Sequence, residues 1–236
     1  MLFTSLTFVF FFTAFFLLYW FAFSTSLTLQ NLFILTGSYI FYAWWDWRFL
    51  FLLVGSSALN YFLGIAIAKS KTERLQNVWL GIGLAQGIGC LIFFKYFIFF
   101  IRSFISAFSA FNIKPDIHTL NIMLPLGISF YTFKTIGYLL DIKKEKIAPT
   151  TNWVVFFSYV AFFPCVISGP IDRPNTLIPQ LEKKRVFDYS QATDGMRQIL
   201  LGLFKKIVIA DNCAAFTSNV LSKKGRIKIQ GYFKSY

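Results

Sequence analysis

The sequence predicts an all-α, polytopic integral membrane protein, and three observations support this fold class. Of the 236 residues, 56% are hydrophobic and only 14% are charged, whereas about a quarter of the residues of a soluble domain are charged. No charged side chain precedes Asp46, and about 20 apolar residues suffice to cross the hydrocarbon core. The apolar runs are long and continuous, without the alternation typical of transmembrane β-strands. We therefore expect about five or six transmembrane or re-entrant helices and one interfacial amphipathic helix.

The first three apolar runs predict three spans. Tryptophans surround Asp46, where an aromatic belt is expected to meet the headgroups. The loop Lys69–Arg74 is basic, so the positive-inside rule places it in the cytoplasm and the N-terminus outside. The first run lacks the basic start and the cleavage site of a signal peptide, so we expect it to remain in the protein. The expected spans are residues 2–23, 29–45 and 49–68.

The central part of the chain predicts two further spans and one ambiguous segment. Residues 77–101 are expected to cross outward, and residues 103–121 to form an external segment and loop. The run 122–140 then returns to a second basic stretch, 141–146. The next run, 153–168, is apolar but short, and it is either a sixth span or a re-entrant hairpin. The charged sequence after it resembles a cytoplasmic one, which favours partial insertion.

The last part of the chain is amphipathic and basic. Residues 189–209 carry apolar side chains at helical spacing with basic residues among them, which predicts a helix in the headgroup plane. The net charge of +13 comes from basic residues between apolar runs, so it fits anionic lipid and not nucleic acid. The three cysteines lack metal-ligand spacing. We expect one membrane domain, residues 1–221, and a basic tail, 222–236, whose composition fits the product of a frameshift.

The segment Leu124–Lys134 places polar groups in an apolar run. Pro125 and Gly127 are expected to bend or break the start of the helix. The polar side chains that follow have two interpretations. They form the wall of a buried tunnel for an acyl donor or acceptor, because polar groups in a bilayer need a cavity or partners, or they form hydrogen bonds between helices. The polar residues concerned are Ser129, Tyr131, Thr132 and Lys134.

The segment Phe162–Arg173 contains a Gly-Pro turn followed by two charges. Gly169-Pro170 forces a non-helical turn, and Asp172 and Arg173 come directly after it. This pattern predicts either a re-entrant turn near a substrate vestibule or the end of a span that carries a surface ion pair. The pattern alone does not separate these interpretations.

The segment Gly202–Asp211 places two lysines on the amphipathic helix. Lys205 and Lys206 suit the phosphates of an acyl donor as point charges, and they equally suit anionic lipid. Asp211 is expected to pair with one of these two lysines.

Together the three segments resemble the membrane-bound O-acyltransferase (MBOAT) family, in its alginate O-acetyltransferase-like branch, over residues 1 to about 220. The order and the spacing of the segments match the N-terminal part of such a protein. The matching residues are Tyr42-Ala-Trp44; Pro125-Leu-Gly-Ile-Ser-Phe-Tyr-Thr-Phe133 with Tyr138 and Asp141; Phe162-Phe-Pro164, Ser168-Gly-Pro-Ile171, Arg173 and Pro179-Gln180; and Gly202-Leu-Phe-Lys-Lys206 with Ile209-Ala-Asp211.

The resemblance implies an enzyme of the cell inner membrane that moves acetyl groups to an alginate-like extracytoplasmic polysaccharide. It implies an acyl thioester donor such as acetyl-CoA, an extracytoplasmic acetyltransferase partner, and no metal or further cofactor. D-alanyl transfer to teichoic acid is an alternative, as is a non-enzymatic membrane scaffold or a pseudogene product. The candidate tunnel or donor residues are Ser129, Tyr131, Lys134, Asp141, Arg173, Lys205, Lys206 and Asp211, and the turn residues are Pro125, Gly127, Gly169 and Pro170.

The sequence offers no candidate for the catalytic residue. The resemblance implies an intramembrane histidine in a Trp-x-x-His-Gly-like setting. The chain has one histidine, His118, which precedes all three motif segments and lies in a predicted external loop. Because a general base must reach the proton that it removes, we expect the 236-residue chain to be a fragment that is catalytically silent by itself.

Overall fold

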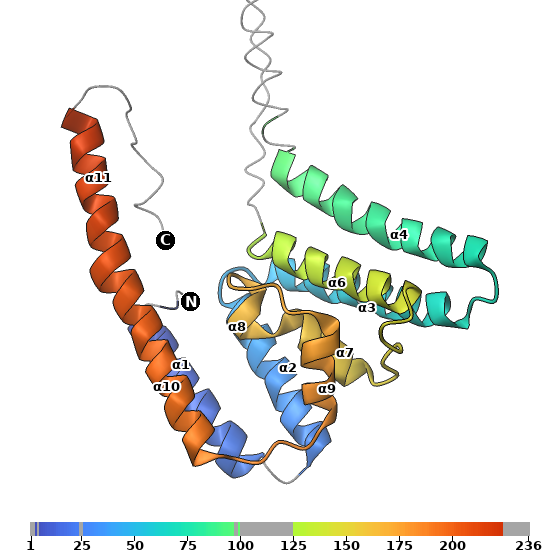
Figure 1. The fold of residues 1–236 in the computed structure, drawn as a ribbon, viewed down its shortest axis with the longest axis horizontal. Coiled ribbons are helices and arrows are strands. Elements are labelled where there is room, and N and C mark those ends of the chain that lie inside the picture. The colour runs from blue at the N-terminus through green and yellow to red at the C-terminus, as the bar shows by residue number, and fades with distance from the viewer. Residues whose placement is uncertain (1–2, 4, 24–25, 97–98, 100–124, 224–236) are drawn as a thin grey trace, which may run out of the picture. The chain divides into compact units, whose positions relative to one another are not determined.

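The computed structural model describes residues 3, 5–23, 26–96, 99 and 125–223, and every element in these ranges is a helix (Figure 1). The all-α prediction is therefore confirmed. The chain forms two units. One consists of residues 21–185 and the other of residues 1–20 with 186–236. His118, the expected external segment 103–121 and nearly all of the basic tail lie outside the described residues.

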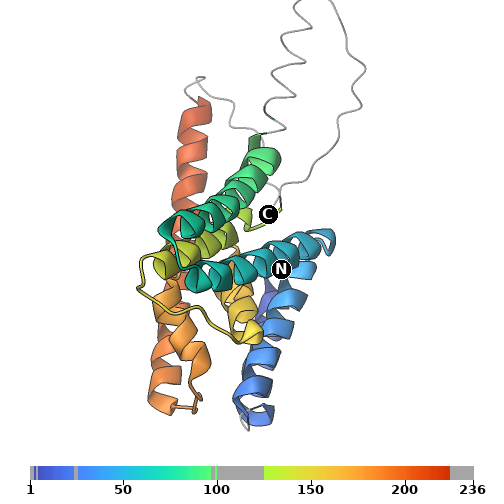
Figure 2. The same cartoon turned by 90° about the vertical axis from the view of Figure 1, so that its right-hand side faces the viewer.

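Three helices of the larger unit lie side by side, as Figures 1 and 2 show for α3, α4 and α6. Their bounds are Arg48–Lys69 for α3, Glu73–Leu91 for α4 and Ile128–Lys143 for α6, and a π-helical turn, Ile92–Tyr96, extends α4. Two helices of the described chain, Arg48–Lys69 and Glu73–Phe94, are long and apolar enough to span a membrane. The expected span 122–140 becomes the 16-residue α6, and the expected span 2–23 becomes the 17-residue run Leu6–Ala22.

Small residues bring these three helices into contact. A Cβ atom built on Gly64 of α3 would touch Tyr138 of α6, and one built on Gly83 of α4 would touch Leu139 of α6. The side chains of Gln86 and Asn60 form a 3.1 Å hydrogen bond between α4 and α3. Glycine contacts and amide hydrogen bonds are the usual means by which membrane helices associate.

We expect Gly83→Ala to loosen this packing. The added Cβ would lie 2.3 Å from Cδ1 of Leu139, so the leucine must change rotamer, at a cost of about 1–3 kcal/mol in the free energy of unfolding. Gly81→Ala on the same helix is the control, because its Cβ would meet no atom within 4 Å. Denaturant titration of both variants in detergent checks this, and equal stabilities would contradict the close packing.

Residues 153–182 form a helical hairpin that packs against α6 and against α2 (Leu27–Ala43). The hairpin contains α7 (Trp153–Ala161), α8 (Phe163–Val166) and α9 (Pro174–Glu182). At its base, the Thr150 hydroxyl donates to the Glu182 carboxylate at 3.1 Å. Near its tip, the Tyr159 hydroxyl donates to the Asp172 carbonyl at 3.2 Å. The chain therefore returns to where it entered, which fits the re-entrant interpretation of this segment and not a straight sixth span.

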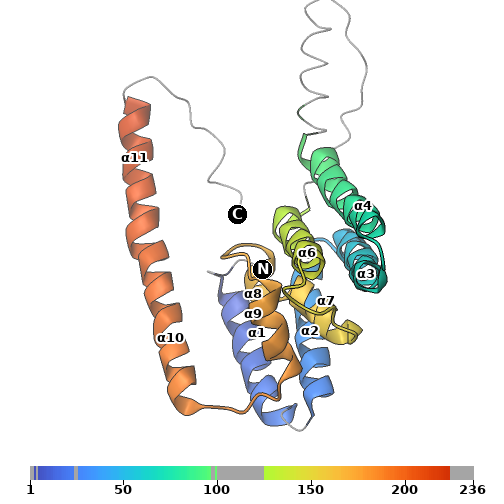
Figure 3. The same cartoon turned by 45° about the vertical axis from the view of Figure 1, so that its right-hand side comes forward.

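The smaller unit contains α1 and one long helical run. α1 is Leu6–Leu17, and the long run consists of α10 (Tyr189–Phe204), a π-helical segment (Lys205–Ala210) and α11 (Asp211–Lys223) (Figure 3). The Asp188 carboxylate caps α10 by accepting from the Ser190 N–H at 2.8 Å. Apolar residues of α10 are exposed, with Leu200 at 63%. The amphipathic helix predicted over 189–209 therefore forms, and it continues further than predicted.

Candidate functional site

A buried lysine lies in the middle of α6, facing the hairpin. Lys134 is only 1% exposed, and its Nζ lies 3.6 Å from Oδ2 of Asp172. The same Nζ donates to the Tyr159 carbonyl oxygen at 3.4 Å and lies 5.5 Å from the centroid of the Tyr159 ring. An ammonium group removed from water needs such partners, because an uncompensated buried charge is costly.

Tyr159 connects α6 with the hairpin by contacts to the backbone carbonyl oxygens of Lys134 and Asp172. Its side chain is fully buried, and its hydroxyl lies within 3.3 Å of the Lys134 carbonyl oxygen and 3.2 Å of the Asp172 carbonyl oxygen. The motifs in the sequence did not predict a role for this residue. A signal existed, because a tyrosine within an otherwise apolar run needs a partner for its hydroxyl when buried.

The start of α6 lies directly against the hairpin. Gly127 precedes α6 with a φ of 71°, and a Cβ atom built on it would lie 2.1 Å from the Val166 carbonyl oxygen. Pro125 is buried just before it. The two turn residues predicted at this place therefore form the turn, and glycine is required there both by its backbone conformation and by the close approach.

The second predicted turn forms the hairpin tip, residues 167–173. Gly169 has a φ of 120°, and both it and Pro170 are exposed. Asp172 faces Lys134, while Arg173 is exposed and precedes the first residue of α9. The alternative in which Asp172 and Arg173 form a surface ion pair is therefore wrong, because the carboxylate points toward the buried lysine.

The remaining candidates of the first motif have individual surroundings. Tyr131 is 1% exposed, and its hydroxyl has no hydrogen-bond partner among the described residues. Thr132 is buried, and its carbonyl accepts a 2.9 Å hydrogen bond from the hydroxyl of Thr135 in the same helix. Ser129 is half-buried in the first turn of α6, and Asp141 is half-buried near the last. These contacts do not decide between a tunnel wall and packing between helices.

The third motif lies in the other unit and has its own geometry. The Lys206 ammonium pairs with the Asp211 carboxylate, while Lys205 is exposed. Residues five apart do not face each other on an α-helix of 3.6 residues per turn. The wider π-helical segment Lys205–Ala210 brings them to one side, since its hydrogen bonds join residues five apart. The Lys206–Asp211 pair belongs to the smaller unit, whereas the Lys134 site belongs to the larger unit.

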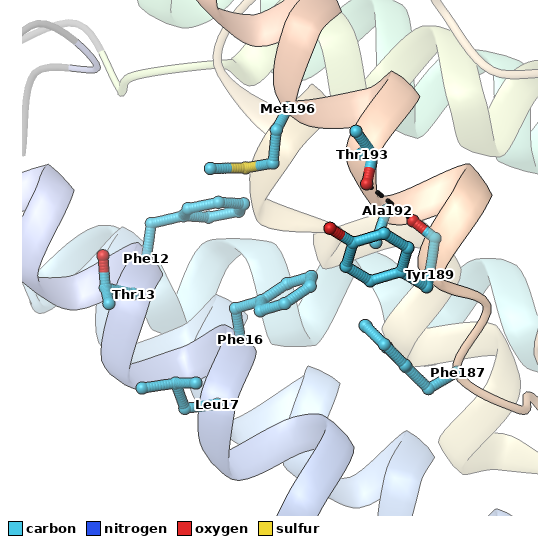
Figure 4. Close-up of a pocket in the computed structure, with 9 residues that line it drawn as sticks. All are labelled: Phe12, Thr13, Phe16, Leu17, Phe187, Tyr189, Ala192, Thr193 and Met196. Atoms are coloured by element: carbon cyan, nitrogen blue, oxygen red, sulfur yellow. Dashed lines mark hydrogen bonds between the residues drawn. The ribbon is translucent and has the colours of Figure 1, made fainter.

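An apolar cavity of about 320 Å³ lies within the smaller unit, between α1 and the start of α10 (Figure 4). Its lining contains aromatic, aliphatic and thioether groups, and the Thr193 hydroxyl is turned to the Tyr189 carbonyl at 2.8 Å. Such a lining suits an acyl chain rather than a phosphate. The lining residues are Phe12, Thr13, Phe16, Leu17, Phe187, Tyr189, Ala192, Thr193 and Met196.

Curated proteins similar to this chain are polysaccharide-modifying acyltransferases by name. The "Probable alginate O-acetylase AlgI" of Pseudomonas aeruginosa is 36% identical over 191 residues, which are 80% of this chain and 36% of that protein. The peptidoglycan O-acetyltransferase of Helicobacter pylori is 33% identical over 224 residues, covering 83% of this chain and 41% of that protein. A teichoic acid D-alanyltransferase of Lacticaseibacillus rhamnosus is 33% identical over 88 residues, 36% of this chain and 21% of that protein.

The first two relatives match most of this chain, although the chain spans only about two fifths of their length. No family model matches the chain, and no solved structure matches it. The matched length includes most of the larger unit, because 80% of the chain aligns. Over the residues that these relatives share with it, the chain is therefore similar to O-acetylating enzymes, which supports the resemblance to the membrane-bound O-acyltransferase family.

Proposed function

We propose that this protein is a multi-pass enzyme of the cell inner membrane that acetylates hydroxyl groups of an extracytoplasmic, alginate-like polysaccharide. The observation that carries the proposal is the meeting of two motif segments, 124–134 and 162–173, at Lys134 and Asp172. These segments carried the resemblance, and relatives at 36% and 33% identity are named as O-acetylating enzymes. Because the chain spans part of those relatives, the activity is proposed for the whole protein.

The proposed reaction transfers one acetyl group. The sugar hydroxyl oxygen attacks the carbonyl carbon of an acetyl thioester such as acetyl-CoA, a C–O bond forms, the C–S bond breaks, and the hydroxyl proton ends on the released thiol. A general base must accept that proton on the way, and we assign this role to no described residue. An extracytoplasmic acetyltransferase partner would present the polymer hydroxyl for this attack, and membrane lipid would surround the spans.

The described groups divide between structural and substrate-facing roles. Lys134 is engaged by Asp172 and Tyr159, so it positions the hairpin and does not contact the donor. Arg173 is exposed at the hairpin tip, and a guanidinium binds carboxylate or phosphate with two hydrogen bonds. We therefore propose Arg173 as the charged group that contacts substrate.

A second candidate function is D-alanyl transfer to teichoic acid. It is supported by the 33% identity over 88 residues to the Lacticaseibacillus rhamnosus enzyme. That match covers 36% of this chain against 80% for the alginate relative, so acetyl transfer is favoured. Ester-linked alanine in place of ester-linked acetate would identify the second function.

The test is complementation of a bacterium that lacks its own alginate O-acetylase. The gene is expressed with the DNA that follows it, so that the whole protein is present, and ester acetate per sugar is measured by NMR. We expect acetate to be restored, and the 236-residue chain expressed alone to be silent. Unmodified polysaccharide despite membrane-inserted whole protein would contradict the proposal and favour the scaffold alternative.

Within this assay, Arg173→Ala is expected to lower ester acetate about tenfold, the effect of losing one charged contact of about 1.4 kcal/mol. Arg173→Lys is expected to recover only part, because an ammonium lacks the planar fork of a guanidinium. Arg74→Ala, which removes another exposed arginine, in the first turn of α4, is the control. Equal acetate in the Arg173→Ala and Arg74→Ala strains would contradict the role of Arg173.

A further inference from the structure

The hairpin has a fixed direction along α6. At its base, the Thr150 N–H donates to the Tyr138 hydroxyl at 3.3 Å, close to the C-terminal end of α6. At its tip, Val166 lies against Gly127, at the N-terminal end of α6. α7 therefore runs antiparallel to α6.

The base of the hairpin lies toward a basic end of the larger unit. Lys143, in the last turn of α6, donates to the Asn77 side chain in the first turns of α4, so the α3–α4 turn and the end of α6 lie together. This end presents exposed basic side chains, and the positive-inside rule assigns it to the cytoplasm. The hairpin tip consequently faces the opposite side. The exposed basic residues are Lys69, Lys71, Arg74, Lys144 and Lys146.

Buried polar groups of α2 hold the hairpin along its length. Asn31 is 1% exposed and donates to the Leu181 carbonyl at 2.8 Å, and the Ser158 hydroxyl donates to the Asn31 carbonyl at 3.1 Å. Further along, the Phe163 N–H donates to the Ser38 hydroxyl at 3.2 Å. These bonds fix α7 and the end of α9, but they stop short of residues 167–173.

The tip itself is tied to α6 through Lys134. Residues 167–173 are non-helical, and Ser168 to Ile171 are exposed. Backbone groups outside helices are tolerated in a membrane protein only where they face water or other protein. The Asp172 carboxylate and carbonyl are held by Lys134 and Tyr159 respectively, so the buried ion pair sets the position of an otherwise exposed loop.

We propose that the hairpin tip, residues 167–173, is a water-facing loop on the extracytoplasmic side where the sugar hydroxyl acceptor meets the protein, and that Lys134 is its positioning residue. The identity of the acceptor rests on the proposed function. The sidedness of the tip rests on the geometry and on the distribution of basic residues, and the role of Lys134 rests on the geometry. The acceptor and the tip then lie on one side of the membrane, while the hairpin base lies on the other.

Cysteine labelling tests the sidedness without any activity. Ser168→Cys and, as control, Lys71→Cys are made in the full chain with Cys90, Cys165 and Cys213 replaced by alanine, and intact spheroplasts are treated with a membrane-impermeant maleimide. We expect Ser168→Cys to react in intact spheroplasts and Lys71→Cys to react only after permeabilisation. Labelling of Ser168→Cys only after permeabilisation, or in neither condition, overturns the proposal.

The positioning role is tested by adding Lys134 variants to the Ser168→Cys protein. We expect Lys134→Met to change the labelling rate at least tenfold and Lys134→Arg to stay within about threefold, because arginine keeps the charge for Asp172. If Lys134→Met does not accumulate, Lys134→Met/Asp172→Asn replaces it, with the same change expected. Labelling at the parental rate in Lys134→Met, or in the double variant that replaces it, overturns the role of Lys134.

The acetylation assay of the whole protein separates the two proposals. Suppose that the polysaccharide stays unmodified while Ser168→Cys is labelled in intact spheroplasts. This result contradicts the proposed function and the sugar hydroxyl as acceptor, but it supports the extracytoplasmic position of the tip. Restored acetate together with labelling of Ser168→Cys only after permeabilisation supports the proposed function and contradicts the extracytoplasmic position of the tip. When both proposals hold, we expect Lys134→Met to lower ester acetate and Lys134→Arg to restore most of it. Loss of folding in every Lys134 variant would instead lower acetate in both.

Discussion

Replacing Lys134 by methionine is expected to lower the free energy of unfolding by about 3 kcal/mol, among the largest single-residue effects we predict for this chain. The substitution keeps the length of the side chain but leaves the Asp172 carboxylate without its cation. Removing one member of a fully buried ion pair costs about 3–5 kcal/mol. The lower end applies because the Asp172 side chain is 27% exposed and the two charged atoms are 3.6 Å apart.

The double variant Lys134→Met/Asp172→Asn separates loss of charge pairing from loss of packing. With both charges removed, no unpaired ion remains, so we expect the double variant to recover at least half of the stability lost in Lys134→Met. Denaturant titration of the four proteins of this cycle in detergent, followed by circular dichroism, gives the coupling energy. A double variant that is destabilised by the sum of its two single effects would show that the two side chains do not interact.

The pairing of Lys134 with Asp172 shows where sequence reasoning ends. The sequence identified both residues and both turns, because Pro, Gly and charge are unusual in apolar runs. It did not identify the partner, since Asp172 stands beside Arg173 in the sequence while Lys134 is far away along the chain. The pairing depends on how the hairpin folds back against α6, and local spacing carries no information on that.

The number and the length of the helices were predicted less well than their class. Hydropathy alone predicted the second span from residues 29–45, and a helix forms there as α2. Its buried face, however, carries Gln30, Asn31 and Ser38. Asn31 and Ser38 form hydrogen bonds with the hairpin, and Gln30 donates to the Arg185 carbonyl. Amphipathic spacing likewise predicted α10 but not the π-helical segment after it, because the sequence of a π-turn has no periodicity that distinguishes it from an α-helix.

Replacing Gly127 by alanine is expected to be as damaging as the loss of Lys134, for a reason that lies in the backbone. A residue with a side chain pays about 1–2 kcal/mol to adopt the left-handed conformation that Gly127 has, with φ of 71°. The new Cβ would also lie 2.1 Å from the Val166 carbonyl oxygen, and a backbone atom cannot rotate away as a side chain does. We expect a total loss of about 3 kcal/mol in the free energy of unfolding.

Gly137→Ala is the matched control for this prediction, because Gly137 lies within α6, which Gly127 precedes, with open space around its Cβ position. In a helix interior, alanine is favoured over glycine by about 1 kcal/mol, so this variant should be as stable as the parent or more stable. The two substitutions add the same methyl group, so opposite outcomes would locate the effect in the left-handed backbone of Gly127 and its contact with Val166. If both variants unfold like the parent, Gly127 and Val166 do not touch, and the tip would then be held through Lys134 and Tyr159.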